Sequence, residues 1–146
     1  MWTILSFGNK DPEWASTIAS HYDKLLKPAY KIKYINCAQK SLSNAQENNL
    51  LQKSIPKNNY IIGLDIYGKQ QTSDDFAANL RKIQLIQGQI CFIIGGSDGL
   101  NTASKNMCHE LWSLSKLTMP HKLAKVILIE QLYRASCILT NHPYHK

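Results

Sequence analysis

LWSLSKLTMPHKLAKVILIEQLYRASCILTNHPYHK, residues 111–146, is the stretch that decides the fold. It predicts a long helix over residues 119–139, with Pro120 in the first turn, where the missing N–H of proline has no intrahelical partner to lose. Apolar residues occupy almost every direction around this helix, whereas a helix on the surface of a monomer shows one apolar stripe. We therefore expect two covered faces, one packed on a sheet of the same chain and the other on a second copy.

The size and charge of the chain predict one domain with a preference for a polyanionic partner. Its 146 residues fit a single domain, residues 1–146, because domains run to roughly 100–200 residues. The 17 Lys and Arg against 10 Asp and Glu give a formal charge of +7. This charge fits contacts with RNA phosphates, and a solvated basic surface explains it equally well.

The cysteines and the hydropathy predict a soluble, cytoplasmic protein. The four cysteines are far apart and form no CxxC motif, which argues for a reducing compartment. The N-terminal sequence MWTILSFGNK has no basic region of the kind that begins a signal peptide. No apolar run approaches the ~20 residues of a membrane span, so we expect no contact with a membrane.

Strands and helices are predicted to alternate along the chain. Short β-branched or apolar runs predict strands over residues 1–7, 31–36, 59–66 and 89–94. Helices are predicted from Asp11 to Pro28 and over residues 41–53, 73–87 and 101–110. This alternation is typical of an α/β fold with a mostly parallel sheet flanked by helices, whose ligands bind outside the carboxyl ends of the strands.

Local signals predict where two of these helices begin and which faces they bury. Asp11 is expected to cap the first helix, and Ser73 the one that Gly88 ends. The positions that recur at helical spacing are Trp14, Ile18, Tyr22, Leu25 and Leu26 in the first helix and Phe76, Ala77, Leu80, Ile83 and Leu85 in the other. We expect these residues to face the core.

Three loops could carry a ligand site: residues 64–69, 95–100 and 114–119. Gly95, Gly96 and Gly99 permit positive φ angles and a close approach of the backbone to a ligand. The glycine loop is neither GxGxxG nor a P-loop, so a plain tight turn also explains it.

The titratable side chains taken one by one predict little chemistry. His142 and His145 are three residues apart without a third ligand, so no metal site is predicted. Glu130 and Arg134 are spaced for an ordinary ion pair within a helix. The sequence shows no clear Ser/His/Asp or Cys/His arrangement, so nucleophilic catalysis is not expected.

Four segments considered together are more informative. They are LDIYGK (64–69), FIIGGSDGL (92–100), SLSKLTMPHKLAKVILIEQLYRA (113–135) and NHPYHK (141–146). In this order they resemble the bacterial ribosomal RNA large-subunit methyltransferase H family of the SPOUT class. The resemblance covers essentially the whole chain, is most specific in its second half and is loose over residues 31–57.

The resemblance implies a fold and a reaction. The fold is α/β with a C-terminal trefoil knot, which is a rare exception to the rule that chains do not thread loops. The reaction is S-adenosylmethionine-dependent methylation of N3 of a pseudouridine in large-subunit (23S) ribosomal RNA. The enzyme is expected to be a homodimer without a metal that acts on the assembled ribosome.

The resemblance also implies a cofactor site in the three loops. Its residues are Leu64, Gly95, Leu114, Ser115, Lys116, Leu117, Thr118 and Met119. Backbone groups from neighbouring loops can hydrogen-bond an adenine edge while leucine and methionine side chains enclose its faces. The backbone conformation of these loops is therefore expected to matter more than most of their side chains.

The remaining matching positions are assigned to RNA and to catalysis. His121, Lys125 and Lys146 are expected to bind RNA. Lys125 stands where many relatives carry arginine, which keeps the charge and loses the planar fork of a bidentate phosphate contact. The catalytic set is Arg134, Tyr144 and His145. We expect Arg134 to stabilise negative charge on the base, Tyr144 to stack on it, and His145 or a nearby group to accommodate the N3 proton.

Three other functions compete with this interpretation. A non-catalytic ribosome-binding protein would show no heat on titration with S-adenosylmethionine. A SPOUT methyltransferase acting on transfer RNA would be separated by mapping the modified nucleoside. A nucleotide-dependent oxidoreductase is disfavoured by the absence of GxGxxG and of an acidic residue after a second strand.

Overall fold

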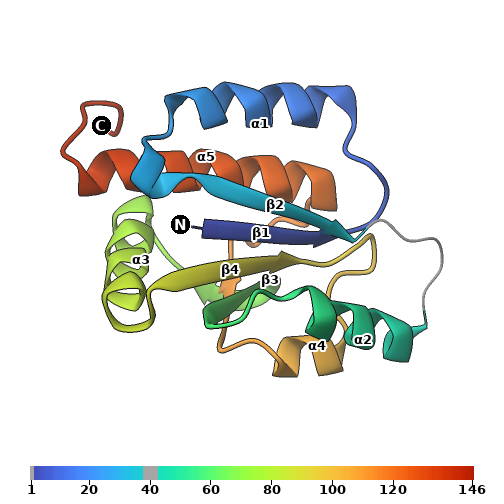
Figure 1. The fold of residues 1–146 in the computed structure, drawn as a ribbon. Helices are drawn as coiled ribbons and strands as arrows, with labels where there is room; N and C mark the ends of the chain where they lie inside the picture. Colours follow the sequence, from blue (N-terminus) through green and yellow to red (C-terminus); the bar gives the residue numbers. More distant parts are fainter. Residues whose placement is uncertain (1, 38–42) are drawn as a thin grey trace.

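The computed structural model describes residues 2–37 and 43–146, and these form a five-stranded parallel sheet flanked by helices (Figure 1). The strand order is β2-β1-β4-β3-β5, and every pair of neighbours runs parallel. The strands are β1 (Trp2–Phe7), β2 (Ile32–Cys37), β3 (Asn59–Gln70), β4 (Gln89–Ile94) and β5 (Glu110–Ser113). The predicted α/β class with a mostly parallel sheet is confirmed, and the carboxyl ends of all five strands lie at one edge.

The helices cover both faces of this sheet (Figure 1). One face carries α1 (Glu13–Leu25), α3 (Ser73–Gln87) and α5 (His121–Leu139), and the other carries α2 (Asn44–Ser54) and α4 (Thr102–Asn106). A short 3₁₀ turn, Pro28–Tyr30, leads into β2. In the described parts of the chain, no helix is long and apolar enough to cross a membrane. The trefoil knot stays a prediction.

The central strands explain why the sheet is the stable core. All six residues of β1 and the last five of β4 are buried, as expected for strands that are covered on both faces. Ile4 and Phe92 pack with Leu128 of α5 on one face, whereas Leu5 and Ile93 pack with Leu51 of α2 on the other. The helix α5 is thus fixed on the sheet by its inward side.

Three predicted helix starts are wrong in detail. Pro120 occupies the cap position of α5 and lies before its first turn. Thr72, rather than Ser73, caps α3, because its Oγ1 accepts a hydrogen bond from the backbone N–H of Asp75 at 3.1 Å. Asp11 does not cap α1, since Pro12 is the cap residue and the Asp11 carboxylate binds two lysines of α5 instead. Gly88 ends α3 as predicted, with φ of 82°.

One strand was not predicted, and two predicted elements differ in length. The predicted helix over residues 101–110 is the five-residue α4, and β5 follows it from Glu110. The strand predicted over residues 59–66 continues to Gln70, so the expected loop over residues 64–69 is wrong: these residues belong to the strand, where its register against β5 is irregular. Met1 and residues 41–42 of the predicted segment 41–53 lie outside the described residues, and α2 begins after Ser43 with a capping box.

Some residues expected in the core are exposed. Leu85 is 78% exposed because the packed face of α3 ends at Ile83, one half-turn earlier. Trp14 and Leu25 of α1 are about half exposed, at 48% and 47%. Their places in the packed face of α1 are taken by Ala15 and, just after the helix, Leu26. These exposed apolar residues are available to a partner.

Candidate active site

A cavity of about 570 Å³ opens at the carboxyl edge of the sheet, between residues 64–67 of β3, where its register against β5 is irregular, and the segments that follow β4 and β5. Leu64 closes one side of it, Gly95 lies at the end of β4, and Leu114 follows β5. The structure brings together every predicted cofactor residue except Lys116: Leu64, Gly95, Leu114, Ser115, Leu117, Thr118 and Met119 line this cavity. That they bind a cofactor stays a prediction.

The glycine loop after β4 requires glycine at two positions. A Cβ at Gly95 would lie 2.3 Å from the carbonyl carbon of Gly99 and 2.6 Å from the backbone nitrogen of Leu100, so no side chain fits there. Gly99 has a φ of 74°, and its N–H donates to the Gly96 carbonyl at 3.0 Å. The loop therefore folds back tightly on itself and forms a backbone wall.

Serine side chains hold the loop after β5 in place. The Ser113 hydroxyl donates to the Ser115 carbonyl at 2.9 Å, and the Ser115 hydroxyl accepts from the Leu117 N–H at 3.0 Å. Both serines are occupied with the local backbone, as expected for a turn stabilised by side chains. Their role is to shape the wall of the cavity.

An acidic and a basic residue that sequence reasoning did not select also line the cavity. Asp65 directly follows Leu64, and its carboxylate lies 3.3 Å from the Lys105 ammonium group of α4. The Tyr67 N–H donates to the same carboxylate at 3.3 Å. An acidic residue within an otherwise apolar strand was a usable signal for Asp65, whereas Lys105 reaches the site only through the packing of α4.

The cavity has the properties of a site for a nucleoside-like ligand. Its volume lies within the roughly 300–1,000 Å³ range of small-molecule sites. Leu114 and Met119 supply apolar walls, the glycine loop supplies backbone, and the Asp65–Lys105 pair supplies charges of both signs. These features fit a ligand with a flat ring and charged ends, and S-adenosylmethionine is such a molecule.

A second, larger hollow of about 870 Å³ adjoins this cofactor cavity. It lies between the loop after β1, which contains Gly8 and Lys10, and Glu47 of α2. The two hollows share His121 and the segment Gly96, Ser97, Asp98 and Gly99, so these residues form the wall between them. Burial and the Asp98 carboxylate raise the pKa of Glu47.

The first residue of α5 lies in this wall. A Cβ at Gly8, whose φ is 118°, would lie 3.0 Å from Nε2 of His121, so the imidazole packs on a backbone position that favours glycine. Burial lowers the pKa of His121, the charge of Lys122 lowers it further, and Asp11 opposes this shift. The net effect favours the neutral imidazole.

Two lysines of α5 are tied to the loop after β1. Lys125 is 4% exposed, and its Nζ lies 2.6 Å from Oδ2 of Asp11 and 5.4 Å from the centre of the Tyr34 ring. Lys122 binds the other carboxylate oxygen of Asp11 at 2.8 Å. Burial raises the pKa of Asp11, but the hydrogen bonds and charges of the two lysines outweigh it, and the net pKa is lowered.

The expectation that Lys125 contacts RNA is therefore not supported by its position. Its charge is buried and neutralised by Asp11, whereas a phosphate contact needs an accessible cation. Lys125 instead joins α5 to the loop after β1. His121 reaches the surface of two hollows, and Lys146 is exposed at the chain end, so both remain candidates for RNA contacts.

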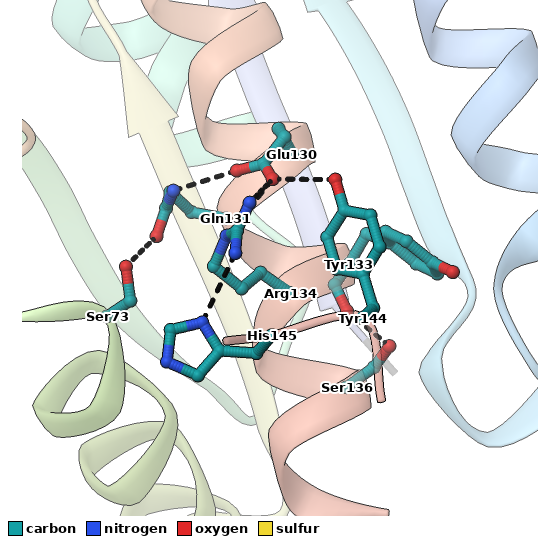
Figure 2. Close-up of polar contacts among 8 residues, drawn as sticks. All are labelled: Ser73, Glu130, Gln131, Tyr133, Arg134, Ser136, Tyr144 and His145. Carbon is teal, nitrogen blue, oxygen red and sulfur yellow. Dashed lines mark hydrogen bonds and ion pairs between the residues drawn. The ribbon is translucent and has the colours of Figure 1, made fainter. Parts of the chain in front are cut away.

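The three predicted catalytic residues meet at the other end of α5 (Figure 2). The Arg134 guanidinium donates to Oε1 of Glu130 at 2.6 Å and lies 4.8 Å from the Tyr144 ring centre. The Tyr144 hydroxyl donates to the same carboxylate oxygen at 3.0 Å, and its ring packs edge-on against Tyr133. The predicted ion pair between Glu130 and Arg134 is confirmed. We call these residues with His145 the tail cluster.

The contact of His145 with Arg134 indicates that Nδ1 of the imidazole carries no proton. Arg134 has only donors, so its Nη1, 3.2 Å from Nδ1 of His145, requires a lone pair on that nitrogen. The other ring nitrogen, Nε2, lies 3.4 Å from the Asp74 carboxylate. In the nearby Tyr144, burial raises the pKa of the hydroxyl, and the hydrogen bonds to Glu130 and Tyr22 raise it further.

The cofactor cavity and the tail cluster lie at opposite ends of α5. His121 and Ala124 line the cavity, and Arg134 is ten residues beyond Ala124, a rise of about 15 Å at 1.5 Å per residue. In Figure 1 the C-terminus lies at the opposite end of the sheet from the arrowheads of the strands. Within the described residues of one chain, the predicted cofactor and catalytic sets therefore do not meet.

Nδ1 of His142 is engaged by the backbone and is not directed at His145. This nitrogen accepts a hydrogen bond from the Tyr144 N–H at 3.2 Å. Among residues 2–37 and 43–146, no group of three His, Cys, Asp or Glu side chains is placed to hold a metal ion.

The parallel sheet, the cavity beside its carboxyl edge and the long C-terminal helix fit the SPOUT class of methyltransferases. A family model described as "Predicted SPOUT methyltransferase" matches residues 1–145. Proteins named "Ribosomal RNA large subunit methyltransferase H" from Legionella pneumophila (strain Paris) and Polynucleobacter asymbioticus are 41% and 40% identical, each over 99% of this chain and 97% of its own length. The chain belongs to this methyltransferase family.

Solved structures show the same fold at much lower sequence identity. A probable methylase family protein from Haemophilus influenzae Rd KW20 has a TM-score of 0.62 at 13% identity, with 99% of this chain and 70% of that chain covered. The SpoU methyltransferase AviRb from Streptomyces viridochromogenes, solved in complex with the cofactor AdoMet, has a TM-score of 0.50 at 14% identity, covering 90% and 56% of the two chains.

Proposed function

We propose that this protein transfers a methyl group from S-adenosylmethionine to N3 of a pseudouridine in large-subunit ribosomal RNA. The observation that carries the proposal is the cavity at the carboxyl edge, where part of β3 and the segments after β4 and β5 converge. The names of the relatives support the RNA substrate, and the AdoMet complex of AviRb supports the cofactor. The formal charge of +7 fits an RNA partner.

The chain's own residues would hold the cofactor mainly through backbone. The glycine loop at Gly95 and the loop from Leu114 to Met119 offer backbone groups to an adenine edge, and their apolar side chains enclose its faces. Lys116 lies in this loop with its side chain outside the lining. When bound, S-adenosylmethionine supplies an activated methyl group.

The second part of the proposal is a homodimer. The side of α5 that faces away from the sheet carries Leu123, Ile127, Glu130 and Arg134 at the helical spacing of one stripe, with Leu123 exposed and the other three half-buried. Leu123 and Ile127 are apolar, and Trp14 of α1 adds a further exposed ring. An antiparallel pair of α5 helices would cover this stripe and bring the tail cluster of one copy to the cofactor cavity of the other.

In such a dimer the predicted catalytic residues have specific roles. Arg134 would stabilise the negative charge that develops on the carbonyl oxygens of the base, and Tyr144 would stack on its ring. His145 or a nearby group would accommodate the N3 proton, and the contact at Nδ1 of His145 would orient Arg134. His121 and Lys146 would contact the RNA, and a small domain of this kind would rely on the assembled ribosome in the cytoplasm to present its target.

The deciding experiment transfers a labelled methyl group to ribosomes that lack the modification and then maps the labelled base. We expect one labelled pseudouridine in large-subunit RNA, with whole ribosomes far better substrates than a short stem-loop. Label in transfer RNA would overturn the proposed substrate. Ribosome binding without heat on titration with S-adenosylmethionine would identify a non-catalytic binding protein instead.

A further inference from the structure

We propose that the second hollow admits the target nucleoside and that His121, in the wall between the two hollows, is the base that accepts its N3 proton. This inference rests on the proposed function and deepens it. It assigns a binding site to the hollow of about 870 Å³ and a catalytic role to a residue outside the tail cluster.

Geometry selects this hollow for the target. Methyl transfer requires the accepting nitrogen to approach the methyl carbon in line, so the target base must occupy space that adjoins the cofactor cavity. The second hollow adjoins it through His121 and the glycine loop and is large enough for one nucleotide. Its lining includes Asn9 and Lys10, a polar and a basic residue that suit a nucleotide with its phosphate.

Position also selects His121 among the possible proton acceptors. His121, Asp98 and Ser97 are the shared wall residues with polar side chains, and imidazole is a stronger base than a carboxylate or a hydroxyl. The lone pair on Nδ1 of His145 is already engaged by Arg134, and Nδ1 of His142 accepts from the Tyr144 N–H. His121 is fixed against the backbone at Gly8, so its ring is held in place before the substrate arrives.

The surroundings of His121 keep it ready to accept a proton. Burial is the largest cause of its lowered pKa, Lys122 is the next, and Asp11 in the loop after β1 acts in the opposite direction. The amino end of α5 also disfavours a positive charge on this residue. The charged residues that line the two hollows around His121 are Lys10, Glu47, Asp65, Asp98, Lys105 and Lys122. Of these, Lys122 is paired with Asp11.

The proposed step conserves atoms and electrons. The N3–H proton of the base passes to an unprotonated ring nitrogen of His121, which becomes an imidazolium. The electron pair left on N3 forms the new bond to the methyl carbon, the carbon–sulfur bond breaks, and its electron pair remains on sulfur. The imidazolium then returns its proton to solvent through the second hollow, and S-adenosylhomocysteine is the other product.

The first test does not depend on activity. The histidine ring signals of the whole protein are followed by NMR as a function of pH. The signal of His121 is assigned as the one that is missing from the spectrum of the His121→Asn variant. We expect His121 to titrate below the ordinary value of about 6.5. In the presence of S-adenosylhomocysteine, added pseudouridine 5′-monophosphate should shift the His121 signal and leave His21 on α1 unmoved. A His121 signal that the nucleotide does not shift would overturn the binding site.

The second test measures single-turnover methyl transfer to unmodified ribosomes at saturating cofactor. At neutral pH, His121→Asn should lower the rate by about 100-fold or more, while His21→Asn stays near wild type. The difference in rate between wild type and His121→Asn should shrink at high pH, where N3 loses its proton to solvent. A rate within about threefold of wild type with an unchanged pH profile would overturn the role of His121. If the wild-type protein itself transfers no methyl group, the proposed function fails and this inference fails with it.

Discussion

The two ends of α5 carry different kinds of site, one shaped by backbone and one formed by side chains. At its amino end, the cofactor cavity is shaped by backbone: the glycine loop leaves no room for a Cβ at Gly95, and two lysines there are paired with Asp11. At its carboxyl end, the tail cluster is a network of partly exposed side chains in which Arg134 and Tyr144 meet at Glu130. One end is defined by shape and the other by side-chain chemistry.

This difference determines how each end responds to substitution. At the cavity, most side chains can change provided that the backbone keeps its path, so glycines and buried charges matter most. In the tail cluster, the guanidinium and the phenol ring themselves would act on the base, so truncation should remove function without disturbing the fold.

The largest effect is expected for Arg134→Ala. Removal of a positive group that stabilises developing charge should lower single-turnover methyl transfer by about 100-fold to 1,000-fold. The affinity for S-adenosylmethionine, measured by calorimetry, should change by less than about twofold, a small fraction of a kcal/mol, because Arg134 is assigned to the target base and does not line the cofactor cavity. Arg81→Ala, on the exposed side of α3, is the matched control. Equal losses of rate and cofactor affinity would contradict the separation of the two ends.

Asp11→Asn should cause the largest loss of stability. It leaves the charge of Lys125 buried without its carboxylate partner, which should lower the free energy of unfolding by about 3 kcal/mol in a denaturant titration. Asp74→Asn removes the carboxylate that contacts His145. Because the Asp74 side chain is 72% exposed, this substitution should lower the free energy of unfolding by less than about 0.5 kcal/mol. Equal losses of unfolding free energy in the two variants would show that the charge of Lys125 does not depend on Asp11 for a partner.

The same pair predicts a pH dependence. The pKa of Asp11 is lowered in the folded protein, so its contribution to stability is present above the unfolded value of about 3.9 and is lost as the pH falls through the folded pKa. The stability difference between wild type and Asp11→Asn should therefore narrow below about pH 4. A difference that stays constant down to pH 2 would show that the lysines do not set this pKa.

Gly95→Ala tests the backbone wall. A Cβ at this position would meet the carbonyl carbon of Gly99 at 2.3 Å, so the loop must move and cofactor affinity should fall by about 100-fold, or about 2.7 kcal/mol. Gly96→Ala is the matched control, because a Cβ there meets no atom within 4 Å, and its effect should be much smaller. Similar affinities for the two variants, with both folded by circular dichroism, would show that the glycine loop does not form the site.

The smallest expected effect distinguishes the two lysines assigned to RNA. Lys146→Gln should reduce the slope of log affinity against log salt for ribosome binding by about 1, with unchanged stability. Lys125→Gln should leave the slope unchanged because its charge is buried beside Asp11. A reduced slope for Lys125→Gln would restore the original expectation that it contacts RNA.

The sequence was most informative where local pattern and tertiary structure agree. The continuous apolar runs of β1 and β4 are readable because central parallel strands are buried on both faces. Gly88 ends α3 through its own backbone preference, and the loops after parallel strands converge by topology alone. For these reasons the fold class and the two cavity segments after β4 and β5 could be predicted, whereas residues 64–69, expected as a loop, belong to β3.

The remaining features depend on contacts between distant residues. β5 is a strand because it pairs with β3, and its four residues carry too little pattern to reveal this. Asp11 has the local context of a helix cap, yet lysines of α5, more than 100 positions away in sequence, attract its carboxylate. The same contact buries Lys125, which no local signal predicts.

The proposal that two copies share their sites is tested most directly by a mixed dimer. Chains carrying Gly95→Ala and chains carrying Arg134→Ala are coexpressed with different tags, and the heterodimer is isolated. It should recover about half of the wild-type methyl-transfer rate, because one intact cavity then faces one intact tail cluster in a symmetric dimer. A heterodimer as inactive as both parents, or a fully active monomer, would contradict the proposal.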